Sequence, residues 1–415
     1  MRGFVASCMD FTPILEEIKP TKKEEKELAT AVQHVLRKIK VAGARPILGG
    51  SGAKQTWLRH THDIDIYVTF PSKTYAHRSA ELSDLLHKAL RKSFSKVTRL
   101  HGSRDYFQLT YQDFVFEIVP ILAIKKASDA RNTTDFSQLH VNYVLKHVKK
   151  NKRLSDEIRL VKQFAKANHV YGAESYIKGF SGYVLELLTI HYGSFERLMK
   201  GAASWKATMV IGDKKVAKNL NPSKISPLIV IDPVQPDRNA AAALSEEKYY
   251  NFILACRAFL RKQSPLFFEE KHIDPCQLQK HGTLVRVDVI PLEGNRDMVG
   301  AKLLKAFTHI KEQIKHHDFT LITAKWSYNP VLKKAVFYYV ADKKELSPTM
   351  KHYGPSSEHK KALLNFKKTH KNVKMMGKQS YVLKKRAYQD ISLLMKDLLR
   401  SENVTSRVKK TQLSL

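Results

Sequence analysis

Apolar residues recur every three or four positions between residues 20 and 40, and this spacing predicts an N-terminal helix that follows a Pro-Thr start. The apolar positions are Leu28, Val32, Val35, Leu36 and Ile39. The stretch ARPILGGS that comes next is typical of a short strand ending in a glycine turn. After it, HDIDIYVTF alternates strictly from residue 62 to residue 68, which predicts a second strand. Asp63 and Asp65 are therefore expected on one face of that strand.

A basic amphipathic segment at roughly residues 76–95 predicts another helix, and two aromatic-rich runs come after it. These runs, DYFQLTY and DFVFEIVPI, are joined by a short turn around Gln112 and indicate a β-hairpin. In the second run, Glu117 alternates with Phe116 and Ile118. A third carboxylate is thus expected on a strand face, beside Asp63 and Asp65.

The apolar spacing becomes helical from about residue 140 onward. Three segments show this spacing: SDEIRLVKQFAKANHVYG, FSGYVLELLTIHYGSFERLM and LSEEKYYNFILACRAFLRK. Ser155, Ser181 and Ser245 are expected to be the N-caps of the three helices. Beyond about residue 263, strand-like runs such as TLVRVDVIPL, TLITAKWSY and KAVFYYVA lie between helical ones. No internal repeat and no long linker is evident.

These elements predict a multidomain α+β protein. A chain of 415 residues exceeds what one hydrophobic core usually organises. We expect three domains: a mixed sheet with helices at residues 1–145, a helical domain at 146–262, and a mixed α/β region at 263–415.

The charge of the chain points to a polyanionic partner. Seventy-two Lys and Arg stand against 39 Asp and Glu, a net charge of +33. Residues 301–415 alone hold 25 Lys and Arg against 8 Asp and Glu, about half of the excess. Self-repulsion of this size is tolerated mainly where nucleic acid neutralises it, and a solubility adaptation is the alternative.

The cysteines and the apolar runs indicate a reducing compartment and no membrane. Cys8, Cys256 and Cys276 are odd in number and widely spaced, which argues against disulfides and against a zinc knuckle. The longest apolar runs are far too short for a bilayer span, and the N-terminal GFVASCM is too short for a signal peptide. We therefore expect a soluble, cytoplasmic protein.

Three strand carboxylates beside a glycine turn suggest phosphate chemistry. Asp63, Asp65 and Glu117 would form a site for one or two Mg²⁺ ions, which prefer hard oxygen ligands and keep water for substrate phosphates. A glycine turn that leads into a helix leaves backbone N–H groups available for phosphate oxygens. Each feature alone is more often a plain turn or a solvated strand face. Their joint order matches the signature of the nucleotidyltransferase superfamily.

Within that superfamily, GGSGAKQTWLRHTHDIDIYV resembles the first block of the archaeal-type (class I) CCA-adding enzymes. Further blocks follow in the family's order: FEIVPIL, TDFSQLHVNYV, EIRLVKQFAKANHVYGAE, GFSGYVLELLTIHYGSFERL, IDPVQPDRNAAAALS and KHYGPSSEHKKALLNFKK. The resemblance spans residues 49 to about 370. It implies a template-independent polymerase that builds or repairs the 3′ CCA of tRNA from CTP and ATP, with two Mg²⁺ ions in catalysis.

The resemblance also implies roles for individual residues. Asp63, Asp65 and Glu117 match the catalytic, metal-binding carboxylates. The matches to nucleotide-binding positions are Ser51, Lys54, His140, Lys162, Tyr171, Ser181, Gly182, Tyr183 and Arg238, with Asp237 beside the last. In the tail block, Gly354-Pro355 is expected to turn into a basic helix that offers Lys360, Lys361, Lys367 and Lys368 to RNA phosphates. The three predicted domains become a catalytic head, a nucleotide-binding neck, and a body with a tail that binds the tRNA acceptor arm. A homodimer is compatible with the sequence.

Two positions depart from the family pattern. The third carboxylate is usually Asp and here is Glu117, which is one methylene longer. The block usually written Asp-Arg-Thr-Pro-Leu-His reads DFSQLH here, so Phe136 stands where the family has Arg. The first departure bears on the metal geometry, and the second on any contact that this Arg would make.

Simpler interpretations remain open for several residues. Tyr171 could be a core tyrosine, His140 a structural histidine, Lys162 a solvated helix charge and Asp237 a helix cap. His60 and His62 flank the Asp pair and invite a zinc interpretation, but two histidines without a third ligand are more often surface residues. For the whole chain, the alternatives are a poly(A)-type nucleotidyltransferase and a catalytically inactive RNA-binding protein of the same fold.

Overall fold

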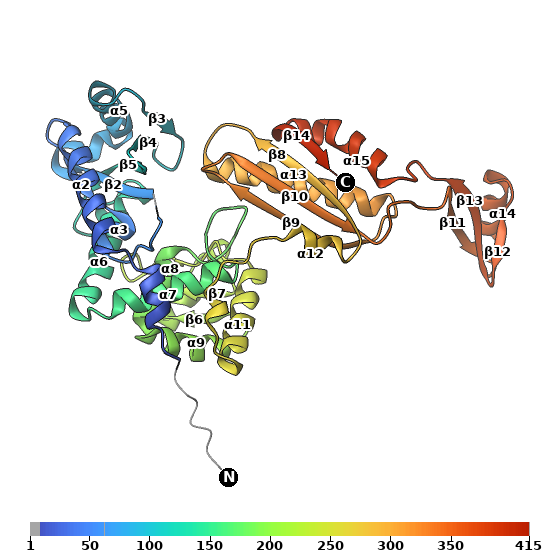
Figure 1. The fold of residues 1–415 in the computed structure, drawn as a ribbon, viewed down its shortest axis with the longest axis horizontal. Helices are drawn as coiled ribbons and strands as arrows, with labels where there is room; N and C mark the ends of the chain where they lie inside the picture. Colours follow the sequence, from blue (N-terminus) through green and yellow to red (C-terminus); the bar gives the residue numbers. More distant parts are fainter. Residues whose placement is uncertain (1–8, 62, 415) are drawn as a thin grey trace, which may run out of the picture. The chain divides into compact units, whose positions relative to one another are not determined.

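The computed structural model describes residues 9–61 and 63–414, so Cys8, most of the GFVASCM segment and His62 lie outside the described residues. Its contacts divide the chain into two compact units, one up to Lys271 and the other from His272 onward. Figure 1 draws the fold of both units. The first unit contains the predicted head and neck, and the boundary between these two stays a prediction.

A five-stranded mixed sheet forms the centre of the head. Its strand order is β1-β2-β5-β4-β3, with β2 and β5 parallel and the other pairs antiparallel. The strands are β1 Arg45–Leu48, β2 Asp63–Pro71, β3 Thr98–Leu100, β4 Tyr106–Tyr111 and β5 Phe114–Ala123. The predicted hairpin is confirmed: β4 joins β5 through Gln112 and Asp113, where Gln112 takes the positive φ of 53° that such a tight turn requires.

Helices pack their apolar faces against this sheet. The predicted N-terminal helix is α2 (Lys22–Lys38), and Thr21 and Glu24 form a capping box at its start. Leu28, Val32 and Val35 of α2 lie in the buried head core together with strand residues. The predicted basic helix is shorter than expected, because residues 76–81 form a 3₁₀ turn before α5 (Leu82–Ser93). The remaining short elements of the head are α3 Gly50–Lys54, α4 Ser72–Tyr75, and the 3₁₀ turns Ala127–Asp129 and Thr133–Phe136. The short helix α1 (Thr12–Ile18) instead buries its apolar residues in the core of the neck.

The neck is mainly helical, as the sequence predicts, with one small parallel sheet of β6 and β7. Its elements are α6 Ser137–Lys150, α7 Leu154–Ala167, α8 Gly182–Tyr192, α9 Phe195–Ala203, β6 Met209–Ile211, α10 Lys214–Lys218, β7 Leu228–Val230 and α11 Glu246–Arg261. Ser181 and Ser245 are the N-caps of α8 and α11, as predicted. The prediction for Ser155 is wrong: α7 already begins at Leu154, and the Ser155 hydroxyl instead donates to the Lys152 carbonyl.

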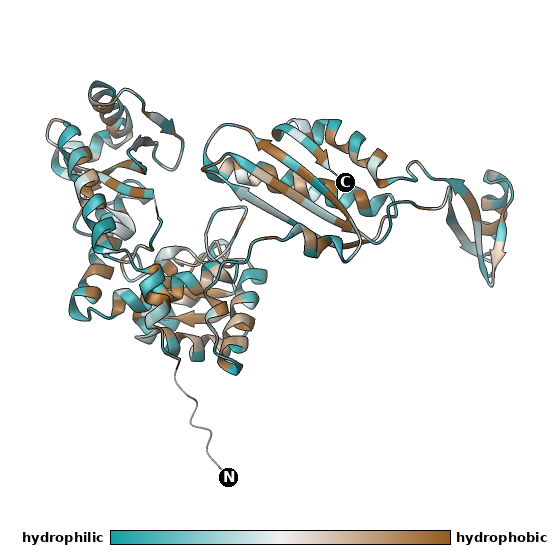
Figure 2. Cartoon of the chain, in the orientation of Figure 1, coloured by the Kyte–Doolittle hydropathy of each residue, from teal (hydrophilic) through white to brown (hydrophobic). Residues whose placement is uncertain are grey.

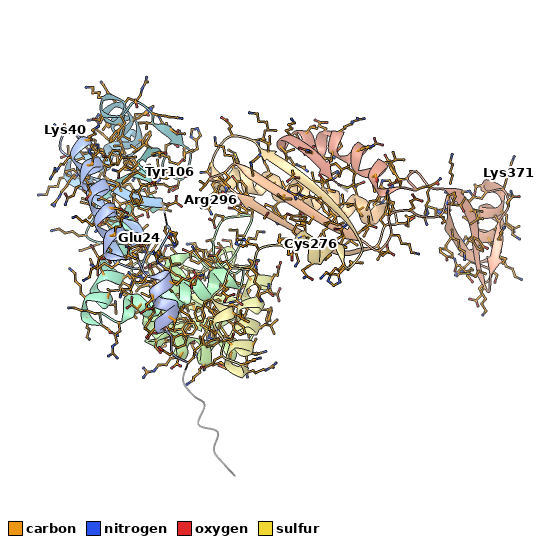
Figure 3. All side chains as sticks on the ribbon, viewed as in Figure 1. Glu24, Lys40, Tyr106, Cys276, Arg296 and Lys371 are labelled. Carbon is orange, nitrogen blue, oxygen red and sulfur yellow. The ribbon has the colours of Figure 1, made fainter. Side chains whose placement is uncertain are left out.

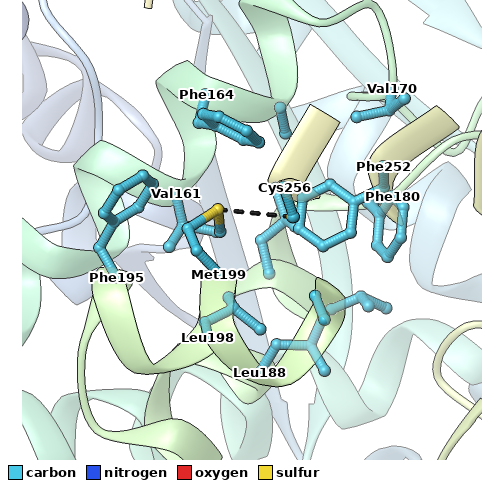
Figure 4. Close-up of a cluster of buried hydrophobic side chains, with 14 of the residues drawn as sticks. Val161, Phe164, Val170, Phe180, Leu188, Phe195, Leu198, Met199, Phe252 and Cys256 are labelled. Carbon is cyan, nitrogen blue, oxygen red and sulfur yellow. Dashed lines mark hydrogen bonds between the residues drawn. The ribbon is translucent and has the colours of Figure 1, made fainter. Parts of the chain in front are cut away.

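One apolar core joins α7, α8, α9 and α11 of the neck (Figure 4). Phe164 of α7 packs edge-to-face against Phe195 of α9 and Phe252 of α11. The Cys256 thiol of α11 lies 3.5 Å from the Met199 sulfur of α9, so this cysteine is a buried, unoxidised core residue. Residues of α7 and α8 pack together in this core.

The body in the second unit has a β-α-β-β-α-β topology around a four-stranded antiparallel sheet of order β14-β8-β10-β9, which is ferredoxin-like. Hydrophobic and hydrophilic residues alternate along the middle of β8, whereas β10 is apolar and buried along most of its length (Figure 2). One face of the sheet packs on α13 and α15. The elements are α12 Pro275–Gln279, β8 Thr283–Pro291, α13 Arg296–His316, β9 Leu321–Asn329, β10 Lys334–Ala341, α15 Ile391–Arg400, α16 Glu402–Thr405 and β14 Val408–Ser414.

The tail is a small three-stranded sheet, of order β11-β13-β12, with one helix, and the chain forms it between β10 and α15. Its elements are β11 Thr349–Ser356, α14 Lys360–Thr369, β12 Lys374–Met376 and β13 Gln379–Lys385. The predicted basic helix exists, but the predicted Gly354-Pro355 turn is wrong. Both residues lie within β11, and the Phe366 ring of α14 packs so closely on Gly354 that a Cβ atom there would meet it at 2.5 Å.

No helix among the described residues is long and apolar enough to span a membrane. The cytoplasmic location stays a prediction.

Candidate active site

The glycine turn after β1 lies directly against strand β2. The Gly49 amide donates to the Asp65 carbonyl at 2.8 Å, and the Gly50 amide donates to the Tyr67 hydroxyl at 3.2 Å. A Cβ atom on Gly50 would stand 1.7 Å from Asp65 Oδ2, and one on Gly49 would stand 2.6 Å from the Tyr67 ring. The two glycines are therefore required because the turn approaches the strand more closely than any side chain allows.

The predicted carboxylates come from two neighbouring strands. Asp65 of β2 is the direct partner of Glu117 in the parallel β5, so their side chains lie on the same face of the sheet. Asp63 stands two residues before Asp65, at the exposed start of β2, and shares that face. Burial raises the pKa of Asp65; the neighbouring Asp63 raises it further, while Lys54 opposes the change. Among the described residues, no three His, Cys, Asp or Glu side chains already converge as a metal cluster.

A polar cavity of about 310 Å³ opens beside Asp65. It brings together seven of the nine predicted nucleotide-binding residues, and α3, β2, α6, α7 and α8 all contribute to its wall. Its lining consists of Gly50, Ser51, Lys54, Asp65, Tyr67, Ser137, His140, Val141, Lys162, Tyr171, Gly182, Tyr183 and Glu186.

Sequence reasoning missed Glu186, which is fully buried in α8 at the cavity wall. Lys54 Nζ lies 2.6 Å and Lys162 Nζ 2.7 Å from its carboxylate. Burial alone would raise the pKa of Glu186, but the two lysines outweigh it and lower the pKa to about 2. Burial lowers the pKa of Lys162 to about 8. The interpretation of Lys162 as a solvated helix charge is therefore wrong. The signal for Glu186 was a lone acidic residue in the apolar run VLELL.

A second buried carboxylate, Asp232, connects three predicted site residues. It accepts a hydrogen bond from the Tyr183 hydroxyl at 3.1 Å and from Arg238 Nη1 at 3.0 Å, and it lies 3.1 Å from His140 Nε2. Burial raises the pKa of Asp232, but His140, the Val234 amide and Arg238 together lower it overall. Asp232 thus ties the cavity residues His140 and Tyr183 to Arg238, whose side chain is 40% exposed.

Other predicted residues take different places. Ser181 does not line the cavity, because its side chain caps α8 by accepting from the Val184 amide. Tyr171 is half-buried, lines the cavity and also packs on the neck core. Asp237 is exposed and is not the N-cap of any described helix.

The segment DFSQLH (residues 135–140), which departs from the family pattern, begins with a buried and fully hydrogen-bonded Asp135. This buried carboxylate pairs with Arg104 and accepts hydrogen bonds from the Leu122, Arg131 and Asn132 amides. Phe136, which stands where the family has Arg, is 8% exposed. The segment before α6 is therefore fixed to the end of β5 by Asp135, and Phe136 adds apolar burial.

The zinc interpretation finds no support among the described residues. The His60 side chain is 76% exposed, and its Nδ1 lies 3.9 Å from Glu24. His62 lies outside the described residues.

The paired carboxylates on parallel strands, the close glycine turn and the polar cavity define a nucleotidyltransferase. A solved structure of the Cid1 RNA terminal uridylyl transferase shares the fold, with a TM-score of 0.51 and 15% identity, and covers 63% of this chain and 97% of its own. A family model described as "tRNA nucleotidyltransferase, second domain" matches residues 156–269.

Sequence relatives give the family. The CCA-adding enzyme of Methanosarcina barkeri is 32% identical over 334 residues, which are 76% of this chain and 72% of the relative. That of Nanoarchaeum equitans is 32% identical over 360 residues, 84% and 86% of the two chains. That of Sulfurisphaera tokodaii is 34% identical over 315 residues, 74% and 72%. The chain belongs to the CCA-adding enzyme family, and nucleotidyltransferases of this kind generally use divalent metal ions.

Proposed function

We propose that this chain builds and repairs the 3′-terminal CCA of tRNA from CTP and ATP without a template. The tRNA 3′-hydroxyl oxygen attacks the α-phosphorus of the nucleotide and forms the new phosphodiester bond. The bond from that phosphorus to the oxygen bridging to the β-phosphate breaks, and pyrophosphate leaves. The observation that supports this most is the pairing of Asp65 with Glu117 beside the polar cavity.

Asp63, Asp65 and Glu117 are the residues that would hold Mg²⁺. Carboxylate oxygens are the ligands that this ion prefers, and Asp65 and Glu117 lie on the same face of the sheet, with Asp65 at the cavity. When bound, the metal would lower the pKa of the attacking hydroxyl and neutralise charge on the leaving pyrophosphate. Within this scheme, the protein's own contribution is to fix the carboxylates and the phosphates relative to each other.

The cavity residues are proposed to bind the nucleotide. Ser51 and Lys54 would hold phosphate oxygens, the lysine as a point charge. His140, Lys162, Tyr171, Gly182 and Tyr183 complete the wall around the ribose and triphosphate. Arg238 would donate to the edge of the base, because a guanidinium can satisfy acceptors on both cytosine and adenine.

The tail is proposed to bind the tRNA acceptor arm. Lys360, Lys361, Lys367 and Lys368 are exposed on α14, and Lys371 (labelled in Figure 3) follows this helix. Double-stranded RNA is recognised mainly through its backbone shape and 2′-hydroxyls, so this basic surface would supply affinity rather than sequence specificity.

One assay tests the proposal. Three tRNA substrates that end before CCA, after one C and after two Cs are each supplied with CTP or ATP separately. The proposed function requires C addition to the first two and A addition to the third, each with Mg²⁺-dependent pyrophosphate release. Addition of A to all three without C would instead identify a poly(A)-type enzyme. Binding of tRNA without pyrophosphate release would identify an inactive RNA-binding protein.

Variants connect the activity to the carboxylates. Asp63→Ala and Asp65→Ala should each abolish nucleotide addition and leave tRNA affinity nearly unchanged, because removing a carboxylate from a basic protein does not weaken phosphate contacts. Substantial residual addition by both variants would contradict the catalytic role of this strand.

A further inference from the structure

Glu186 is buried with a set of partners that hold both of its oxygens. Oε2 accepts from Lys54 Nζ at 2.6 Å, and Oε1 accepts from the Thr56 hydroxyl and from Lys162 Nζ, both at 2.7 Å. None of its side chain is exposed. A buried ionised carboxylate is costly unless charges and hydrogen bonds compensate it, and here two ammonium groups and one hydroxyl do so.

The partners of Glu186 belong to the segment that leaves the glycine turn. Lys54 ends α3, and Thr56 follows two residues later. From α7, Lys162 also donates to the Thr56 carbonyl at 3.1 Å, while Arg159 donates to the carbonyls of Gln55 at 2.8 Å and Trp57 at 3.0 Å. Side chains of two neck helices therefore hold residues 54–57 of the head, which lie more than 100 positions earlier in the chain.

The two lysines use their donors differently. Lys162 Nζ has three acceptors, the Thr56 carbonyl, the Thr56 hydroxyl and Glu186, which match the three donors of an ammonium group. Lys54 Nζ has Glu186 as its one hydrogen-bond acceptor among the described residues, and it lies at the cavity wall. Lys54 therefore keeps donors for a ligand, whereas Lys162 is fully engaged in holding Glu186 and Thr56.

We infer that Glu186 is a positioning residue for nucleotide transfer, which fixes the Lys54 ammonium at the point of the cavity where the triphosphate is held. The inference rests on the proposed function, because it requires Lys54 to contact the nucleotide. Lys162 holds the Glu186 carboxylate and Thr56 through its own hydrogen bonds, and Arg159 holds the carbonyls of Gln55 and Trp57 on either side of Thr56. The competing explanation is a buried ion pair that stabilises the fold and does nothing to the reaction.

A double-mutant cycle separates these two explanations. Single-nucleotide CTP addition is measured for the wild type, Glu186→Gln, Lys54→Met and the double variant, together with the melting temperature of each. Glu186→Gln should lower kcat/KM for CTP about tenfold or more, because a misplaced cation no longer meets the phosphates. In the Lys54→Met background the same change should have little further effect, since Glu186 acts through Lys54. Additive losses would overturn the inference.

A matched control and a second variant keep the test decisive. Glu157→Gln makes the same chemical change in α7 at a carboxylate that accepts from the Phe195 amide and does not line the cavity. It should change stability and leave kcat/KM as in the wild type. If Glu186→Gln does not fold, Glu186→Asp replaces it in the double-mutant cycle with Lys54→Met. The Asp side chain keeps the negative charge but is one methylene shorter, so its carboxylate lies farther from Lys54. Wild-type kinetics of Lys54→Met would contradict the proposed phosphate role of Lys54 itself, whereas an impaired Lys54→Met with additive losses contradicts only the positioning by Glu186.

Discussion

Asp65 Oδ2 occupies the space that a Cβ atom on Gly50 would need, 1.7 Å from the position of that atom. Gly50 also has a φ of +54°, where residues with a Cβ atom are strained. The turn and the carboxylate therefore fit together as one unit, and the sequence of the turn is constrained by the strand behind it.

Gly50→Ala should consequently displace Asp65 and reduce nucleotide addition by about 100-fold, since a shift of about 1 Å in a catalytic group has effects of that size. Gly52→Ala is the control, because its Cβ atom would meet only the flexible Leu48 side chain, at 3.4 Å. Steady-state kinetics of the two purified variants check the prediction. Equal activity of both would show that Asp65 tolerates the displacement.

Glu117→Asp should remain active, and Glu117→Gln should be inactive. The register places residue 117 directly opposite Asp65, so a shorter carboxylate still faces the same site. An amide keeps the size of the side chain but removes the charge that would hold a divalent cation. Addition assays over a Mg²⁺ titration measure this, and a fully active Gln variant would remove Glu117 from the metal site.

Arg238→Ala should raise misincorporation of UTP or GTP relative to CTP and ATP by about tenfold, which is the value of one lost charge-assisted hydrogen bond. Binding of the triphosphate should change less, because the proposed phosphate-binding residues Ser51 and Lys54 are untouched. Competition between correct and incorrect nucleotides gives the ratio. An unchanged ratio would assign Arg238 only to its ion pair with Asp232.

Glu186 should also make the stability of the first unit fall in acid. Its folded pKa of about 2 lies below the ordinary value of 4.5, so its contribution is complete above pH 4.5 and disappears as the pH falls from there through about 2. The difference in pKa corresponds to about 3 kcal/mol of unfolding free energy. Urea unfolding of the wild type and Glu186→Gln across this range should show an advantage of the wild type that shrinks in acid. A constant difference would mean that the pKa of Glu186 is the same in the folded and the unfolded protein, and would contradict the lowered folded pKa.

Neutralising Lys360, Lys361, Lys367 and Lys368 should raise the dissociation constant for tRNA and flatten its salt dependence, because fewer counterions are released from the RNA. Addition at saturating tRNA should persist. Neutralising the exposed Lys214, Lys215 and Lys218 of α10 in the neck provides the comparison. A salt slope identical to that of the wild type in the α14 variant would place the RNA-binding surface elsewhere.

The local sequence pattern was sufficient to predict elements whose structure is determined by residues close to them in the chain. The alternation in HDIDIYVTF gave β2, and the same rule applied to Glu117 put it on the face of Asp65. Ser181 was recognisable as an N-cap because its own helix decides that role. The prediction for Ser155 was wrong because α7 begins two residues earlier than a helix capped by Ser155 would, with Arg153 at the N-cap.

The hidden parts of the site depend on partners far apart in the sequence. In the sequence Glu186 is only a lone acidic residue in an apolar run, and its partners become visible once α8 is packed against residues 54–57. Lys162 looks like a surface charge until Glu186 is placed beside it. Gly354 looks like a turn residue, but it lies in β11, where the Phe366 ring packs closely on it. Such roles come from the tertiary fold, which periodicity does not encode.

The two chain segments that connect the tail to the body, residues 344–346 and 389–391, are hydrogen-bonded to each other. Glu345 pairs with Asp390 in an antiparallel bridge, the Leu346 amide donates to the Gln389 carbonyl at 2.8 Å, and the Ile391 amide donates to the Lys344 carbonyl at 3.1 Å. The two ends of the inserted tail are hydrogen-bonded to each other, so the length of the tail has little effect on the entropy that the body loses when its sheet forms. Even for a flexible loop without such bonds, each doubling of the length costs only about 0.6 kcal/mol. The length of this extension can therefore change without altering the register of β10 and β14 against β8.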